Sequence, residues 1–208
     1  INARPFQIRR ERGGASEVMA VDDHISATAH VAQLLGMPPE SEGGAVLRAF
    51  AEKFGTVASK LAEPEVELFD IVFLDLVRAG DVNDRAALAE ALAPIPNAPR
   101  KLVIDLAFDD AIIVAGPLLK ASQRLDEEIL LTIVSEKGPQ HLACIAVRPT
   151  VPERLSDRLI ERGDETVLLA LVNNSGASFS EAGRVTAVER SFAWPDVFIA
   201  IDRRSDFG

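Results

Sequence analysis

Hydrophobic and polar positions alternate with a helical period between residues 153 and 176, in the stretch ERLSDRLIERGDETVLLALVNNSG. Apolar residues recur three or four positions apart before and after Gly163 and Asp164, and this spacing predicts two short helices joined at those two residues. Neither helix carries a nucleophile beside a base or two metal ligands at a usual spacing. We interpret the stretch as a helical hairpin that builds a surface.

The same pattern recurs along the chain. Residues 129–146 align without a gap on residues 155–172, so that Ile133 falls on Leu159 and Leu142 on Leu168, an offset of 26 residues. Residues 102–119 follow the same template, and residues 184–201 follow it less closely. Repeated helical hairpins of this length are typical of an α-solenoid, because one hairpin cannot bury its apolar face without a neighbour. The sequence therefore predicts an all-α fold, an α-solenoid of HEAT-like helical hairpin repeats, in which Ile133, Leu159, Leu168 and Leu171 are buried.

Three predicted helix starts support the repeat. Asn97 and Thr150 each stand two residues before a proline, where they could cap a helix whose first turn contains that proline. Ser178 with Glu181 has the spacing of a capping box.

The N-terminal third is less regular. Residues 1–20 are a basic arm without a sustained period, to which we assign no role. Residues 21–65 predict an N-terminal helical element of two helices, the second of which places Phe50, Phe54, Val57 and Leu61 on one face. The next helix, over residues 65–80, has residues 83–93 as its expected partner, and the repeat domain covers residues 66–208.

An α/β fold is the competing interpretation, because the runs LVIDLAF, AIIVAG and VFIAI are apolar and β-branched enough to be buried strands. These runs keep the register of clearly helical segments such as ERLSDRLIERG, and no glycine-rich phosphate loop follows any of them. The pattern favours helical repeats.

Composition narrows the class of partner. The chain has 32 acidic and 22 basic residues and a net charge of −10, which disfavours binding to nucleic acid through phosphate contacts. No apolar stretch approaches the length of a membrane span, and the single cysteine, Cys144, fits a reducing compartment. We expect a cytoplasmic protein that binds neither membrane nor nucleic acid.

The residues that could carry chemistry are scattered. His24, His30 and His141 are far apart, so we expect no metal site and no cofactor. The acidic pair Asp109-Asp110 and the acidic run of residues 126–128 fall at expected helix ends, where carboxylates complement the helix dipole. Cys144 lies three residues after His141, but in an apolar run that should keep its thiol protonated. We expect no catalytic residue.

One polar column stands out where the second helices of successive hairpins end. The runs LLKAS, IAVRP, LVNNS and AIDRR end these helices and carry Arg148, Asn174, Asp202 and Arg203 at or next to equivalent positions. These side chains could cap helix C-termini, or Arg148, Asn174 and Arg203 could form a ridge that binds a peptide or protein partner.

The order of motifs over about residues 66–208 resembles a bacterial family, the domain of unknown function 2336 (DUF2336), which is typical of alphaproteobacteria. The resemblance rests on the runs LAEALAPIPNAPRKLVIDLAFDDAIIVAGPLLKASQRLDEEILLTIV, HLACIAVRP, LSDRLIERGDETVLLALVNNSGASFSEAG and RRSDF. It implies an all-helical, HEAT-like architecture in a bacterial cytoplasm and brings no activity, ligand or catalytic residue.

The expected function is a non-catalytic protein-interaction or scaffold module, in bacterial signalling or regulation, with a protein or peptide as partner. The alternative is an enzyme built on helical repeats, resembling a bilin lyase or a DNA glycosylase, with a pocket on the concave face. A glycosylase would need a basic face and aromatic side chains for an extruded base, whereas this chain is acidic and has no tyrosine.

Overall fold

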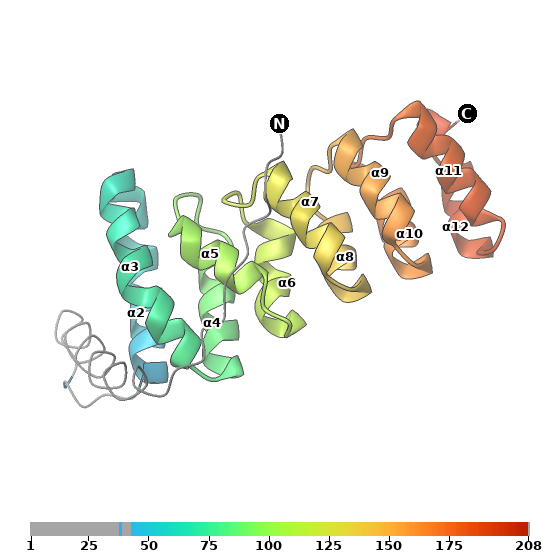
Figure 1. Ribbon diagram of the computed structural model, residues 1–208. Helices are drawn as coiled ribbons and strands as arrows, with labels where there is room; N and C mark the ends of the chain where they lie inside the picture. The colour runs from blue at the N-terminus through green and yellow to red at the C-terminus, as the bar shows by residue number, and fades with distance from the viewer. Residues whose placement is uncertain (1–37, 39–42, 208) are drawn as a thin grey trace, which may run out of the picture.

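The computed structural model describes residue 38 and residues 43–207 of the chain, and these residues are all-helical (Figure 1). Their α-helices are α2 (Gly43–Val57), α3 (Glu63–Ala79), α4 (Val82–Leu92), α5 (Arg100–Ala107), α6 (Ile112–Ala121), α7 (Glu127–Glu136), α8 (Pro139–Ala146), α9 (Glu153–Arg162), α10 (Glu165–Val172), α11 (Glu181–Ser191) and α12 (Pro195–Asp202). Two 3₁₀ helices, η1 (Ala58–Lys60) and η2 (Ser205–Phe207), follow α2 and α12. The basic arm and the first expected helix lie outside the described residues.

The helical prediction is confirmed against the α/β alternative. The three strand-like runs lie in α5, α6 and α12, and the described residues contain no strand, only an isolated bridge between Val151 and Ala177. Helix α6 explains the ambiguity, because it packs between α4 and α8 and against α5 and is therefore apolar nearly all round. The hairpin predicted around Gly163 is also present, as α9 and α10.

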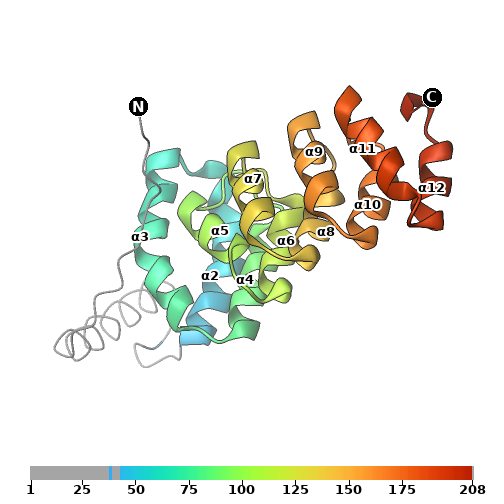
Figure 2. The ribbon, with the colours of Figure 1, turned by 45° about the vertical axis from the view of Figure 1, so that its right-hand side comes forward.

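The helices lie in two layers, which Figures 1 and 2 show from two directions. In one layer α2, α4, α6, α8, α10 and α12 pack side by side in that order. In the other layer α3 packs on α5, α7 on α9 and α9 on α11. Helix α4 therefore lies between α2 and α6. The sequence analysis had instead expected it to pair with the preceding helix, α3.

The residues predicted to be buried by the repeat are in the core. Ile133, Leu159, Leu168 and Leu171 have no exposed surface. The predicted face of the α2 region is correct only in part, because Phe50 and Phe54 are buried but Val57 is 40% exposed. Helix α2 ends at Val57 and the chain tightens into η1, so the helical phase that would place Leu61 on the same face is lost.

The predicted caps were wrong at the residue level. The side chain of Ser180, not Ser178, caps α11 by accepting a hydrogen bond from the main-chain nitrogen of Gly183 at 2.9 Å. Helices α5 and α9 begin after Pro99 and Pro152 without a side-chain cap. Asn97 instead donates to main-chain carbonyl oxygens of the segment that follows α2, those of Ala58 and Leu61.

Candidate functional site

Arg148 stands just after α8 and reaches back to the end of α6. Its Nη1 donates to the carbonyl oxygen of Leu119 at 2.7 Å, and its Nη2 donates to that of Ser122 at 2.8 Å. The last carbonyl groups of a helix have no partner within the helix, so a guanidinium at this place satisfies them and also complements the helix dipole. Burial lowers the pKa of the Arg148 guanidinium from its ordinary value. Arg148 thus joins the ends of two neighbouring helices.

Asn174 makes the equivalent contact one hairpin later. Its Nδ2 donates to the carbonyl oxygens of Ala146 and Arg148, at 2.8 and 2.7 Å. Its Oδ1 accepts a hydrogen bond from the main-chain nitrogen of Gly176 at 2.9 Å. Both ends of the amide are therefore engaged inside the protein, and the side chain joins the end of α10 to the end of α8.

The third member of this series is Arg204, and the predicted register at the C-terminal end was wrong. Arg204 donates through Nη1 to the carbonyl oxygens of Val172 and Asn174, at 2.9 and 2.7 Å. Its Nε bonds Asp206 at 2.8 Å, and its guanidinium lies 4.8 Å from the centre of the Phe179 ring. Burial and these partners fix Arg204 over the end of α10. The sequence analysis had placed Asp202 and Arg203, and not Arg204, in this series.

Arg203, the third predicted binding residue, is exposed. It lines a surface hollow of about 410 Å³ together with Val172, Asn173, Ser175 and Asp206, among others. Its side chain forms no hydrogen bond with the described residues, in contrast to Arg148 and Asn174. The structure thus brings Arg148 and Asn174 together and leaves Arg203 on the surface beside them.

The other layer has a similar series that the sequence analysis missed. Arg190, at the end of α11, donates to the carbonyl oxygens of Ile160 and, at 2.7 Å, of Gly163, where α9 ends. Arg162, at the end of α9, donates to the carbonyl oxygen of Ser135 near the end of α7. The sequence signal for these contacts was an arginine in the last turn of α9 and of α11. An arginine at such a position usually indicates a contact with the end of the helix that carries it, and not with a neighbouring helix.

Ion pairs join successive helices of this second layer near their N-termini. Arg100 of α5 lies 2.6 Å from Asp126, which caps α7, and Arg154 of α9 pairs with Glu128 of α7. The hydrogen bond from the main chain of Ile129 and that from Arg100 hold the pKa of Asp126 below its usual value. These acidic residues therefore act on helix N-termini, as the sequence predicted for the run 126–128.

The residues best suited to chemistry are occupied or buried. The Nε2 of His141 lies 2.9 Å from the carbonyl oxygen of Asp109, and the Asp109 carboxylate accepts from Arg85 Nε and the main chain of Ala111, both at 2.8 Å. Burial raises the pKa of the Cys144 thiol above its usual value, so the thiol stays protonated at neutral pH. In the described part of the chain, no three His, Cys, Asp or Glu side chains form a group that could hold a metal ion.

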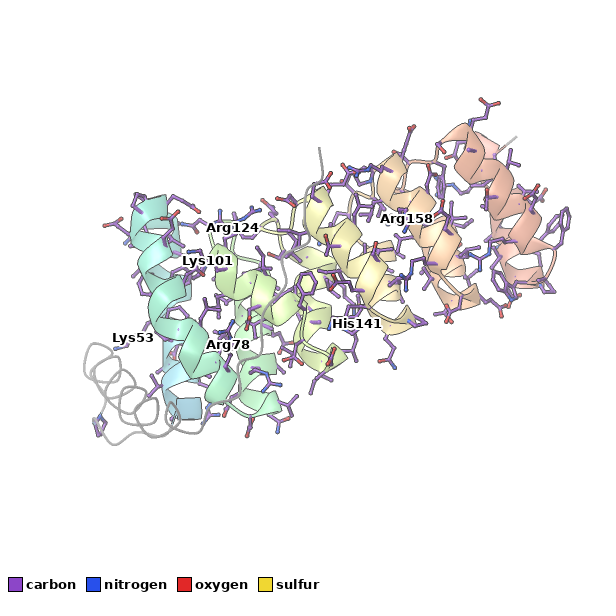
Figure 3. The ribbon with its side chains drawn as sticks, viewed as in Figure 1. Lys53, Arg78, Lys101, Arg124, His141 and Arg158 are labelled. Atoms are coloured by element: carbon purple, nitrogen blue, oxygen red, sulfur yellow. The ribbon has the colours of Figure 1, made fainter. Side chains whose placement is uncertain are left out.

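A second hollow lies where α3, α4 and α5 meet. It has a volume of about 290 Å³ and is lined by Val77, Leu106 and two ion pairs, Arg78–Asp105 at 2.9 Å and Arg85–Asp109 at 2.8 Å. Figure 3 shows Arg78 beside the lower half of α3, away from His141. Each carboxylate in this hollow has a guanidinium partner and is therefore already engaged within the protein.

Among the described residues, no helix combines the length and the apolar composition needed to cross a bilayer. Comparison with curated proteins and with solved structures found no match. A family model described as an uncharacterised protein conserved in bacteria, DUF2336, matches residues 114–207. The match begins within α6 and extends into η2, so it is shorter than the resemblance over about residues 66–208. The matched part contains the series Arg148, Asn174 and Arg204, and in residues 114–207 the chain is similar to the DUF2336 family.

Proposed function

We propose that the chain is a HEAT-like α-solenoid that acts as a non-catalytic protein-interaction module. The observation that carries the proposal is the recurring contact at the helix ends. Arg148, Asn174 and Arg204 each donate to the last carbonyl groups of the preceding helix in the same layer. A contact repeated in this way fixes each hairpin on its neighbour, which is how solenoids build extended surfaces from short helices.

The placement of reactive groups supports a role in binding. His141 and Cys144 are buried, and the carboxylates of Asp109 and Asp126 are used in ion pairs and helix caps. Several large apolar side chains are exposed instead, and they are Val57, Ile113, Val147, Val185, Phe192, Phe198 and Ile199. Exposed apolar and aromatic side chains contribute more to protein interfaces than to the surfaces of isolated domains.

We further propose that the partner is a protein or peptide in the bacterial cytoplasm, in a signalling or regulatory setting. The net charge of −10 opposes nucleic acid as ligand. Of the three residues first proposed for the binding edge, Arg203 has the side chain available to a partner. Arg148 and Asn174 bind main-chain carbonyl groups of their own chain. A binding edge at the helix ends would therefore depend on Arg203.

A capture experiment tests the proposal. The folded chain is immobilised and exposed to a bacterial lysate, and bound proteins are identified by mass spectrometry. A heat-unfolded sample of the same bait controls for capture by exposed apolar segments. We expect proteins that bind the folded bait alone, and weaker capture by Arg203→Ala at an unchanged melting temperature.

The alternative, a helical-repeat enzyme, predicts a different result. A small molecule would raise the melting temperature of the chain, and substitution of Asp105 or Asp109 in the hollow of α3, α4 and α5 would remove that shift. This outcome without any captured protein would contradict the interaction module.

A further inference from the structure

The second layer of helices is interrupted between α5 and α7. Among the described residues α3 packs on α5, α7 on α9 and α9 on α11, but α5 does not pack directly on α7. The first layer has no such interruption, since α6 packs on α4 and on α8. Gly116 of α6 faces α8 so closely that a Cβ atom added to it would lie 3.5 Å from the Sγ of Cys144. The helices are therefore continuous on one side of the molecule and separated on the other.

The burial of equivalent side chains shows the interruption from the side of α7. Leu102, Ile129 and Leu155 hold the same place in α5, α7 and α9, according to the alignment of the repeats. Leu102 and Leu155 have no exposed surface, and their helices pack directly on the preceding helix of the layer. Ile129 is partly exposed. An apolar side chain that is covered in the hairpins before and after it thus stays in contact with solvent in α7.

Helix α5 presents apolar side chains to the same place. By the alignment Ile104 corresponds to Asp157 of α9, which faces the next helix of its layer, because it accepts a hydrogen bond at 2.8 Å from the Oγ of Ser180, the cap of α11. Ile104 therefore faces α7, and Phe108, four residues later, lies on the same side of the helix. Both are only partly buried. We call the interval between α5 and α7, bordered by Ile104, Phe108 and Ile129, the break.

Two ion pairs span the break, one near each end of the helices. Arg100 lies 2.6 Å from Asp126, where α5 and α7 begin, and Lys137 lies 2.5 Å from Asp110, where they end. The carboxylate side chains are 51% and 96% exposed, so water and salt reach both pairs. Exposed ion pairs contribute little free energy and are screened by salt, whereas buried apolar contacts are not. The break is therefore held by weaker contacts than the other steps of the layer.

We propose that the break is a hinge, at which the row of hairpins changes its curvature. The contact between α6 and α8 stays in place, and the second layer opens and closes about it between α5 and α7. Closing brings Ile104 and Phe108 toward Ile129 and removes apolar surface from water, while the two ion pairs set the width of the break. Hinges of this kind confine a conformational change to a few contacts. The inference concerns the chain alone and does not depend on the proposed interaction with a partner.

Pulsed electron paramagnetic resonance tests the hinge through distances between two spin labels. Labels on Lys101→Cys and Glu153→Cys, in α5 and α9, span the break, and labels on Thr132→Cys and Glu189→Cys, in α7 and α11, span two steps with direct packing. All four positions are exposed, and Cys144→Ala removes the native thiol.

The distances are measured between about 0.01 M and about 1 M ionic strength. We expect the mean distance across the break to shift by about 2 Å or more and the distance from α7 to α11 to stay the same. An equal response of the two label pairs, or no response of either, would overturn the hinge.

Variants test the role of the ion pairs. We expect Arg100→Ala together with Asp110→Ala to give, at low salt, the distances across the break that the parent chain shows at high salt. The matched control is Arg154→Ala, which removes an exposed ion pair with Glu128 where α7 packs directly on α9, and we expect it to leave the distances unchanged. If the double variant keeps the distances and the salt response of the parent, the ion pairs do not set the width of the break and the proposal fails. The salt series on the parent chain decides the hinge even where the double variant does not fold.

Discussion

The side-chain amide of Asn174 donates to the main-chain carbonyl oxygen of Arg148 over 2.7 Å. These two residues occupy equivalent places in successive hairpins. Asn174 therefore donates to carbonyl groups at the end of α8, the helix that Arg148 follows. Arg148 does the same for the end of α6, and Arg204 for the end of α10. In every case the donor side chain follows the later hairpin, and the carbonyl groups that accept its hydrogen bonds lie at a helix end of the hairpin before it.

The first prediction concerns the cost of removing this contact. Asn174→Ala leaves the carbonyl groups of Ala146 and Arg148 without their donor, and we expect it to lower the free energy of unfolding by about 1 to 3 kcal/mol. Urea denaturation measures the loss. Asn173→Ala is the matched control, because Asn173 is exposed and bonds only a carbonyl of its own helix, that of Leu169. Equal effects of the two substitutions would refute the role of Asn174 as a link between hairpins.

Arg203 and Arg204 are adjacent in sequence but differ in their contacts. We expect Arg204→Ala to destabilise the chain by about 1 to 3 kcal/mol, because it removes donors from the end of α10 and the cation over Phe179. We expect Arg203→Ala to change stability by less than about 0.5 kcal/mol, as for most exposed residues. Thermal and urea unfolding of both variants decide the register. A larger loss for Arg203→Ala would restore the alignment made from the sequence.

A core substitution tests the packing of the second layer. Leu159 of α9 is fully buried, and its replacement by alanine leaves a cavity. We expect Leu159→Ala to cost about 2 to 5 kcal/mol of unfolding free energy. Val185→Ala on α11, where the side chain is exposed, provides the comparison for a truncation outside the core. A loss well below about 1 kcal/mol for Leu159→Ala would mean that the helix faces are misassigned.

Asp126 predicts a dependence of stability on pH. Hydrogen bonds from the main chain of Ile129 and from Arg100 lower its pKa in the folded state below the ordinary value of 3.8. A lowered folded-state pKa stabilises the protein above the unfolded pKa, and this contribution is lost as the pH falls through the folded-state value. Asp126→Asn keeps a capping side chain but removes the charge.

The measurement is the free energy of unfolding of the parent chain and of Asp126→Asn between about pH 6 and pH 3. We expect the parent to be the more stable at the upper end and the difference to shrink below a pH of about 4. A difference that stays constant over this range would show that the Asp126 charge does not contribute to stability.

The sequence was informative where one segment repeats another. The offset that places Ile133 on Leu159 and Leu142 on Leu168 predicted four buried side chains correctly, because apolar residues at helical spacing must face the core in each copy. It also predicted that Arg148 and Asn174 occupy equivalent places, because the segments that carry them align without a gap. The same alignment could not place Arg204, since the loop between α10 and α11 is longer than the loop between α8 and α9.

Polar contacts were harder to predict than burial. Asn97 and Ser178 both had the spacing of helix caps, yet Asn97 bonds the segment after α2 and the cap of α11 is Ser180. A side chain of this kind can satisfy any unpaired main-chain group within reach. Which main-chain group lies within reach depends on the conformation of the loop and on the position of the neighbouring helix. The spacing of residues along the sequence gives no information about either.

By itself, the sequence determined that this protein is helical and that Ile133, Leu159, Leu168 and Leu171 enter the core, because these properties follow from the period of apolar residues along the chain. Only the tertiary structure decided the partners of Arg148, Asn174 and Arg204, and only it left Phe192 and Phe198 exposed on α11 and α12. The physical reason is that a hydrogen bond requires two groups within about 3 Å in a suitable direction. Residues about 26 to 32 positions apart reach that distance only after the helices have packed.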